Sequence, residues 1–213
     1  YRRQRQMCIR DSLRITATGR YFFPLPIKAK QMDTIRLHDK TFRRSISCEQ
    51  LQKAIAEVSA RINSDYREKR TPLFVGVLNG SFMFMGELLR HISFDCEVSF
   101  VKIASYSGTA TTGRVRELIG LSQDIRGRHV IHVEDIVDTG ASIEYMTGVL
   151  KKQGPADIAV ATLLFKPECY RKQTPPKYYA LSIPDKFIVG FGLDYDQLGR
   201  NYKDIYEIAD DHE

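Results

Sequence analysis

The chain has 213 residues, 43% of them apolar, so it can bury the core of one domain of ordinary to large size. Its longest predominantly apolar run, 158–165, has eight residues where a membrane-spanning helix needs about 20, so we expect no membrane partner. The net charge is +6, but residues 1–31 carry +7, from eight basic residues and one acid, which leaves −1 for the rest. A body this close to neutral has no excess of basic residues for nucleic acid, and we expect no nucleic-acid partner.

The four cysteines lie far apart along the chain, and no Cys-x-x-Cys or Cys/His pairing occurs. This spacing is typical of reduced thiols rather than of a disulfide framework or a zinc site. We therefore expect a cytoplasmic protein.

The leader, residues 1–31, is rich in arginine, poor in acids and without the apolar region of a secretory signal. Three interpretations fit it: an organelle transit peptide, a disordered basic arm, or translated non-coding or cloning-derived sequence. We favour the third, because Met32-Asp33-Thr34-Ile35 resembles a natural start and the preceding residues lead into no periodic pattern. We set 1–31 aside as a disordered or non-native leader and expect 32–213 to form a single domain.

The first periodic segment follows an extended or irregular entry at residues 32–46. Ser47, with Gln50 three residues later, fits a capping box at the start of a helix. Apolar residues then recur at helical spacing, and Pro72 disfavours helix just before it, so the predicted helix ends near Arg70. These apolar residues are Leu51, Ile55, Val58, Ile62 and Tyr66.

Strands and helices then alternate along the chain. The small, polar segment 106–116 interrupts them and predicts a mobile loop. The alternation predicts an α/β fold, a mainly parallel twisted sheet flanked by helices on both faces. The predicted strands are 73–78, 97–105, 115–121, 129–134, 158–165, 178–182 and 187–189, and the further predicted helices are 81–91 and 141–153.

The segment 130–142 has the most informative pattern. An apolar strand runs into two adjacent acids, two apolar residues, a third acid and Thr-Gly, and a helix follows. Ligands of open parallel sheets bind at the carboxyl ends of strands, and a helix start offers free N–H groups and a positive dipole end to phosphate. Without a ligand, the acids would only solvate a turn and cap the helix. A Walker A sequence, the rival phosphate site, is absent.

This segment resembles the ribosyl-phosphate-binding signature of the type I phosphoribosyltransferases. The resemblance covers most of residues 40–208 and is closest to the hypoxanthine–guanine branch of that family. It implies that Glu134 and Asp135 serve the ribose hydroxyls and Mg²⁺, and that Asp138 is the general base at purine N7. It also implies a small hood subdomain beside the main sheet and a mobile active-site loop. The residues implied to bind the 5′-phosphate are Thr139, Gly140, Ala141 and Ser142.

Three further features fit a 6-oxopurine: Lys166, Phe187, and Asp194 followed by Arg200. Lys166 closes an apolar strand and Phe187 lies in an apolar segment, although a strand-end lysine and a core phenylalanine would look the same. The resemblance implies that Lys166 contacts purine O6, that Phe187 stacks on the base and that the backbone of Ile188 meets the base edge. It implies that Asp194 reaches a second Mg²⁺ or the purine amino group, and that Arg200 contacts pyrophosphate.

The resemblance also implies a pyrophosphate site at Asn79 and Gly80, where family members hold a cis peptide. Many relatives have Lys or Arg at the position of Asn79, so this chain lacks that charge, which removes the side-chain role but leaves the backbone contact possible. Ser105 and Tyr106 begin the predicted loop, which would close over the site and exclude water.

The implied activity is purine salvage. The 5-phosphoribosyl group of 5-phosphoribosyl 1-pyrophosphate would pass to N9 of hypoxanthine or guanine, giving IMP or GMP and pyrophosphate. The resemblance further implies Mg²⁺ as cofactor and a homodimer or homotetramer. Two alternatives remain open: a sibling enzyme for xanthine or another base, and a non-catalytic regulator that senses phosphoribosyl pyrophosphate. Lys166 and Phe187 argue against adenine and pyrimidines, and the near-neutral body argues against the regulator.

Overall fold

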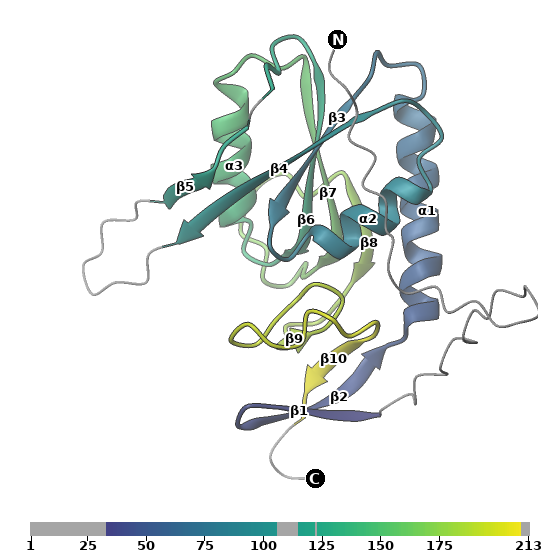
Figure 1. Cartoon of the computed structure of the whole chain (residues 1–213), viewed down its shortest axis with the longest axis vertical. Helices are drawn as coiled ribbons and strands as arrows, with labels where there is room; N and C mark the ends of the chain where they lie inside the picture. The colour runs from purple at the N-terminus through teal and green to yellow at the C-terminus, as the bar shows by residue number, and fades with distance from the viewer. Residues whose placement is uncertain (1–32, 106–114, 122, 210–213) are drawn as a thin grey trace, which may run out of the picture. The chain divides into compact units, whose positions relative to one another are not determined.

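A six-stranded sheet forms the main layer, with the strand order β5-β4-β3-β6-β7-β8 (Figure 1). The computed structural model describes residues 33–105, 115–121 and 123–209. Five of the strands are parallel, and β5 pairs antiparallel with β4 at one edge, which confirms the predicted fold class. The strands are β3 (Leu73–Leu78), β4 (Glu97–Ser105), β5 (Val115–Ile119), β6 (His129–Val137), β7 (Asp157–Phe165) and β8 (Tyr178–Ser182).

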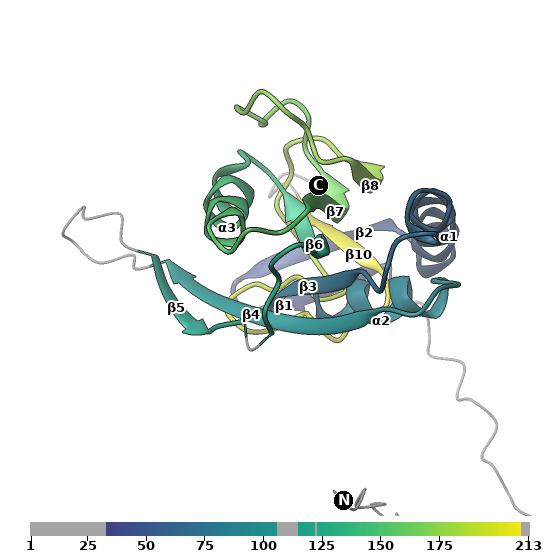
Figure 2. The same cartoon turned by 90° about the horizontal axis from the view of Figure 1, so that it is seen from above.

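Helices cover both faces of this sheet, as predicted. Figure 2 shows α3 (Ala141–Lys151) on one side of the sheet and α1 (Cys48–Tyr66) on the other. Neighbouring apolar residues of β3 and β6 point to opposite faces of the sheet and pack in two separate clusters. Phe74 and Ile131 pack in one buried cluster with residues of α1 and α2 (Phe82–Arg90). Val75 and Val130 pack in a second cluster with residues of α3.

The capping box at the start of α1 is confirmed. The Ser47 hydroxyl accepts a hydrogen bond from the Gln50 backbone N–H, and the Gln50 side chain accepts one from the Ser47 N–H. All five apolar residues predicted for its inner face are buried. The helix ends at Tyr66 rather than near Arg70. Residues 67–70 are exposed, so a further helical turn would bury no apolar side chain there.

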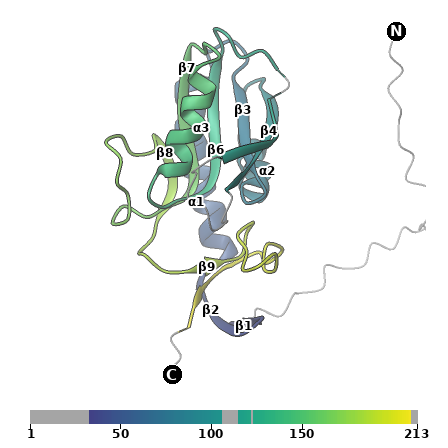
Figure 3. The same ribbon diagram turned by 90° about the vertical axis from the view of Figure 1, so that its left-hand side faces the viewer.

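A second, antiparallel sheet forms the hood, with the order β1-β2-β10-β9. It lies beyond the carboxyl ends of β3 and β6 (Figure 3). A small core of its own holds it together, and Phe42, Val189 and Tyr206 are buried there. Of the two interpretations of 32–46, extended or irregular, the extended one is confirmed, because this segment forms two strands and the second of them pairs with a strand near the C-terminus. The hood strands are β1 (Thr34–Leu37), β2 (Lys40–Ile46), β9 (Ile188–Val189) and β10 (Ile205–Ile208).

Strand β6 is three residues longer than predicted, because it runs to Val137 instead of ending at Glu134. Its register with β7 continues past the acid pair, and Val137 still pairs with Phe165. The acid pair therefore lies on the last part of a central strand, and only Asp138-Thr139-Gly140 remains as the connection to α3. The bounds of the other predicted strands and helices from residue 73 onward differ from the structure by at most two residues.

The leader 1–31 lies outside the described residues, and both its origin and the single domain over 32–213 stay predictions. Within the part of the chain that the structure describes, no helix has the length and apolar content that a membrane span requires.

Candidate functional site

A cavity of about 590 Å³ opens at the carboxyl ends of β3 and β6. Four chain segments line it: the end of β3, the end of β6, the start of α3 and the stretch between β9 and β10. The cavity brings together eight of the residues predicted from the sequence. They are Gly80, Glu134, Asp135, Thr139, Ala141, Ser142, Asp194 and Arg200.

The acid pair at the end of β6 forms one wall. The Glu134 side chain is buried, and its Oε1 lies 3.0 Å from Nε2 of His132. Asp135 is partly buried, and its Oδ1 accepts a hydrogen bond of 2.8 Å from the backbone N–H of Ile136. Burial and the adjacent charge of Glu134 raise the pKa of Asp135 to about 6. Two carboxylates that line the same cavity favour a ligand that carries hydroxyl donors or a cation.

The turn after β3 lies against this pair. The peptide bond between Leu78 and Asn79 is cis, which confirms the expectation from the resemblance. A Cβ at Gly80 would lie 1.5 Å from Oδ2 of Asp135, so only glycine fits between this backbone and the carboxylate. On the other side, a Cβ at Gly192 would lie 2.2 Å from the Gly80 carbonyl oxygen. The turn is thus packed between β6 and the segment that leads to Arg200.

The start of α3 forms the opposite wall. Gly140 is the N-cap residue, with φ of 85°, and it has no side chain with which to cap the helix. The first helical hydrogen bond runs from the Glu144 N–H to the Gly140 carbonyl. Ala141 and Ser142 are exposed to the cavity, so the first turn presents backbone N–H groups and the positive end of the helix dipole to it. This geometry suits a phosphate.

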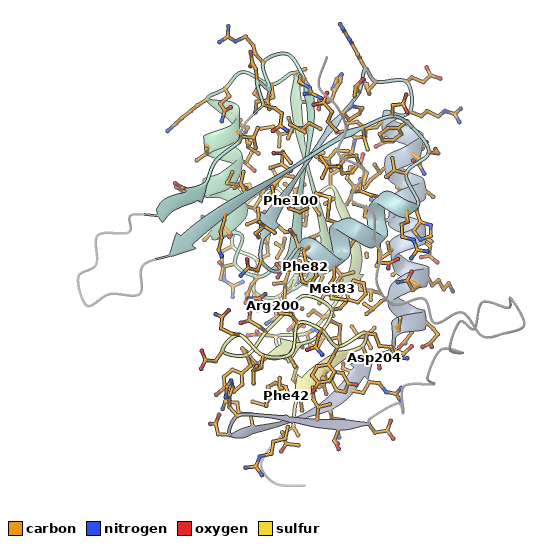
Figure 4. The ribbon with its side chains drawn as sticks, in the orientation of Figure 1. Phe42, Phe82, Met83, Phe100, Arg200 and Asp204 are labelled. Carbon is orange, nitrogen blue, oxygen red and sulfur yellow. The ribbon has the colours of Figure 1, made fainter. Side chains whose placement is uncertain are left out.

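Arg200 and Asp194 form an ion pair at the hood side of the cavity, with 2.6 Å between Nη2 and Oδ1. The Arg200 guanidinium also donates to the Gly192 carbonyl through Nη1, and Asp194 Oδ2 accepts from the Gln197 N–H. Figure 4 shows Arg200 in the stretch between the main sheet and Phe42 of the hood. The resemblance assigned these two residues to different ligands, and in this structure they neutralise each other.

A second group of predicted residues lies next to the first. Lys166 follows β7 directly, its side chain is buried, and its Nζ lies 3.6 Å from Oδ2 of the exposed Asp138. Its closer partner is Asp185, with 2.9 Å between Nζ and Oδ1. This hydrogen bond holds the pKa of Asp185 below its usual value. Lys166 is therefore shared between the predicted general base and an acid that the sequence had not singled out.

Phe187 precedes β9 and is 46% exposed. Its ring packs against Phe42 and Tyr195 of the hood, with centroid distances of 6.1 Å and 5.7 Å. Ile188 begins β9, the edge strand of the hood sheet, and its side chain is buried. The hood thus supports an aromatic ring, and nearly half of the Phe187 surface stays exposed, so that another flat group can stack on it.

Comparison with known proteins agrees with this geometry. Residues 47–196 match the phosphoribosyl transferase domain family. The chain belongs to the phosphoribosyltransferase family. It is 39% identical over 157 residues to the hypoxanthine-guanine phosphoribosyltransferase of Streptococcus pneumoniae, covering 73% of this chain and 87% of that protein. It is 41% identical over 150 residues to the hypoxanthine phosphoribosyltransferase of Haemophilus influenzae, covering 69% and 84%.

Solved structures of this enzyme family have the same fold. A hypoxanthine-guanine phosphoribosyltransferase of Bacillus anthracis has a TM-score of 0.72 at 35% identity, covering 78% of this chain and 96% of its own. A hypoxanthine phosphoribosyl transferase of Trypanosoma cruzi has a TM-score of 0.75 at 32% identity, covering 82% of this chain and 95% of its own. This phosphoribosyltransferase is therefore an enzyme with the type I fold.

Some predicted site residues of this phosphoribosyltransferase do not line the main cavity. Ser105 ends β4, and Tyr106, with most of the predicted loop 106–116, lies outside the described residues. The others that do not line it are Asn79, Asp138, Gly140, Lys166, Phe187 and Ile188.

Among the contacts of predicted site residues that the sequence did not indicate are two from charged or titratable side chains, Asp185 on Lys166 and His132 on Glu134. Asp185 stands two positions before Phe187, but it is 19 residues from Lys166, and no local pattern joins them. His132 had a local signal, because a strand places residues two apart on one face, and it precedes Glu134 by two.

Proposed function

We propose that this enzyme works in purine salvage, transferring the 5-phosphoribosyl group of 5-phosphoribosyl 1-pyrophosphate to N9 of hypoxanthine and of guanine. The products are IMP or GMP and pyrophosphate. The observation that carries the proposal is the cavity in which the acid pair, the open start of α3 and Arg200 converge. The names of the relatives support the purine substrate.

The ribose 5-phosphate end of the substrate fits the walls formed by β6 and α3. Backbone N–H groups over Thr139–Ser142 would donate to the 5′-phosphate, and the short connection at Gly140 brings them to the cavity. The carboxylates of Glu134 and Asp135 would accept hydrogen bonds from the two ribose hydroxyls. A phosphate at one wall and a diol at the other are the two ends of a ribose 5-phosphate.

The pyrophosphate end fits the turn after β3 and the hood side. Backbone groups of Asn79 and Gly80 and the guanidinium of Arg200 would hold the leaving group, which would compete with Asp194 for that guanidinium. Among the described residues, no group of three or more His, Cys, Asp or Glu could hold a metal alone. Mg²⁺ is usually bound by one or two carboxylates plus substrate phosphates, and Glu134, Asp135 and Asp194 fit that mode. Bound Mg²⁺ would neutralise charge that develops on the pyrophosphate.

The purine fits between Lys166 and Phe187. The Lys166 ammonium would donate to O6, the backbone of Ile188 would meet the base edge, and the Phe187 ring would stack on the base, worth about 1–3 kcal/mol. Asp138 would accept the N7 proton while N9 bonds to C1 of the ribose and the bond to pyrophosphate breaks. General-base catalysis of this kind typically contributes about 10²–10⁴-fold in rate.

We also propose a homodimer or homotetramer that acts in the cytoplasm. The free thiols of Cys48, Cys96 and Cys169 support a reducing compartment. The solved Trypanosoma cruzi relative was studied for the role of its C-terminal region in oligomeric state and enzymatic activity, which supports assembly. Light scattering of the full chain would give the mass of the assembly, and a monomer would contradict this part of the proposal.

An absorbance assay of the full chain tests the function. Phosphoribosyl pyrophosphate and Mg²⁺ are supplied with hypoxanthine, guanine, xanthine or adenine in turn. We expect nucleotide with hypoxanthine and guanine, no product with adenine, and no product when Mg²⁺ is chelated. Product with adenine alone would contradict the assignment of Lys166, and absence of product with every base would contradict the function. Filter binding with DNA or RNA tests the regulator, for which we expect no retention.

A further inference from the structure

His132 is a fully buried polar residue in the middle of β6, and the mechanism above gives it no role. Its backbone pairs with Val75 of β3 and Val160 of β7, so apolar residues flank it on both neighbouring strands. Val130, two positions earlier on the same face, packs with residues of α3 in an apolar cluster. An aliphatic side chain would suit the position of His132 equally well.

Burying an imidazole is costly unless both ring nitrogens find partners. Nε2 lies 3.0 Å from Oε1 of Glu134, whereas Nδ1 has no hydrogen-bond partner among the described residues. The ring is therefore only half satisfied, and packing of the sheet does not explain its presence. Within the same described residues, His132 is also the one side chain that hydrogen-bonds the Glu134 carboxylate.

We propose that His132 is a positioning residue for phosphoribosyl pyrophosphate. Its Nε2–H donates to Oε1 of Glu134 and fixes the carboxylate at the end of β6, which leaves Oε2 for a ribose hydroxyl. A carboxylate can only accept here, so the contact assigns the imidazole proton to Nε2. This role deepens the proposed function and rests on it, because it names how one wall of the ribose site is kept in place.

The neighbourhood of Glu134 explains why it needs a donor. Asp135 is the next residue, and the two like charges repel each other at the same strand end. A Glu134 carboxylate without its histidine would be free to turn away from Asp135 and from the ribose hydroxyl. Partners that orient a ligand-binding group in this way typically change affinity or activity about 10–100-fold when removed.

The test compares two substitutions at position 132. His132→Leu removes the donor and keeps an apolar side chain of useful size, whereas His132→Gln keeps an N–H donor that can reach Glu134. We expect His132→Leu to raise both the KM and the calorimetric Kd for Mg²⁺-phosphoribosyl pyrophosphate roughly tenfold, with the KM for hypoxanthine unchanged within about twofold. His132→Gln should restore most of the affinity. If Leu prevents folding, the shorter amide of His132→Asn replaces it and must show the same rise.

A double-mutant cycle separates positioning from packing. In a Glu134→Gln background, His132→Leu should change the Kd by less than about twofold, because its effect passes through the carboxylate. The matched control is Thr162→Val, which removes a buried hydroxyl from the β7 residue paired with Glu134 and should leave the Kd unchanged. Multiplicative effects in the cycle, or wild-type affinity in His132→Leu, would overturn the proposal.

The outcomes also separate this proposal from the proposed function. A wild type that binds phosphoribosyl pyrophosphate but forms no IMP contradicts the transfer reaction, and the calorimetric comparison still tests His132. A wild type that forms IMP while all position-132 variants keep its KM contradicts the role of His132 alone. A wild type that neither binds nor turns over contradicts both.

Discussion

The buried Lys166 is tied to Asp185, with 2.9 Å between Nζ and Oδ1, although 19 residues separate them in the chain. Asp138 is the next carboxylate, with its Oδ2 3.6 Å from the same nitrogen. The ammonium therefore has two competing acceptors. The hydrogen bond to Asp185 keeps the Lys166 ammonium from pairing tightly with Asp138. The proposed mechanism needs the Asp138 carboxylate as a free base.

Asp185→Asn should weaken purine recognition. Without the anchoring carboxylate, Lys166 has only Asp138 as an ionic partner, so it turns away from O6 and makes Asp138 less basic. We expect the KM for hypoxanthine to rise roughly three- to tenfold and kcat to fall, with the KM for phosphoribosyl pyrophosphate unchanged. Steady-state kinetics checks this, with Glu168→Gln, an exposed acid on the loop that follows Lys166, as the control. An unchanged KM for hypoxanthine would refute the anchoring role.

Asp138→Asn should separate binding from chemistry. Its side chain is exposed and does not line the main cavity, so the substitution leaves the phosphate and ribose contacts in place. We expect kcat to fall about 10²–10⁴-fold while the Kd for phosphoribosyl pyrophosphate stays within about twofold. Calorimetry and single-turnover kinetics measure the two quantities. A variant with the kcat of the wild type would show that Asp138 is not the base.

Gly80→Ala should disable the turn after β3. The new methyl group would lie 1.5 Å from Oδ2 of Asp135, so either the turn or the carboxylate must move. We expect phosphoribosyl pyrophosphate binding to be lost and the melting temperature to fall. The control is Gly86→Ala in α2, where nothing lies within 4 Å and helix propensity should add about 0.5–1 kcal/mol. Binding by Gly80→Ala at wild-type affinity would disprove the close approach.

The stability of the free enzyme should depend on Asp135. Its pKa is about 6 in the folded chain, above the ordinary value of 3.8 for an aspartate. Between these values the folded state holds a proton that the unfolded state has lost, so the free energy of unfolding falls as pH rises from about 4 to 6. At about 1.4 kcal/mol per pH unit, the carboxyl of Asp135 alone lowers the free energy of unfolding by about 2–3 kcal/mol between acidic pH and pH 7.

Asp135→Asn removes that titration, so the free energy of unfolding should depend less on pH. Urea unfolding at pH 5 and pH 7.5 would measure the free energy of unfolding of both proteins. We expect the variant to be more stable than the wild type at pH 7.5. The same substitution should weaken phosphoribosyl pyrophosphate binding, because an amide replaces the carboxylate. A variant with the same pH dependence as the wild type would contradict the raised pKa.

Local patterns were enough to predict much of the fold. The capping box at Ser47 and the helical spacing after it predicted α1, and the apolar runs predicted the main sheet. The hood was implied only by the resemblance, because β2 pairs with β10 from the far end of the chain and only two of its seven residues, Phe42 and Ile46, are apolar. Contacts between distant segments carry no local signal.

The candidate site also combines features with a local sequence pattern and contacts between distant segments. The acids of β6 and the start of α3 are neighbours in the sequence, and their pattern was enough to predict a phosphate site at a strand end. The approach of Gly192 to Gly80 and the bond between Lys166 and Asp185 arise only when the chain folds. The sequence therefore indicated the groups that we propose to bind substrate more readily than the groups that hold them in position.

The central claim is the transfer of a phosphoribosyl group to a 6-oxopurine. Its most direct test mixes the full chain with Mg²⁺, phosphoribosyl pyrophosphate and hypoxanthine and measures IMP and pyrophosphate by chromatography. The account predicts that the two products appear in equal amounts and that neither appears when hypoxanthine is left out. Pyrophosphate without IMP, or no product at all, would contradict it.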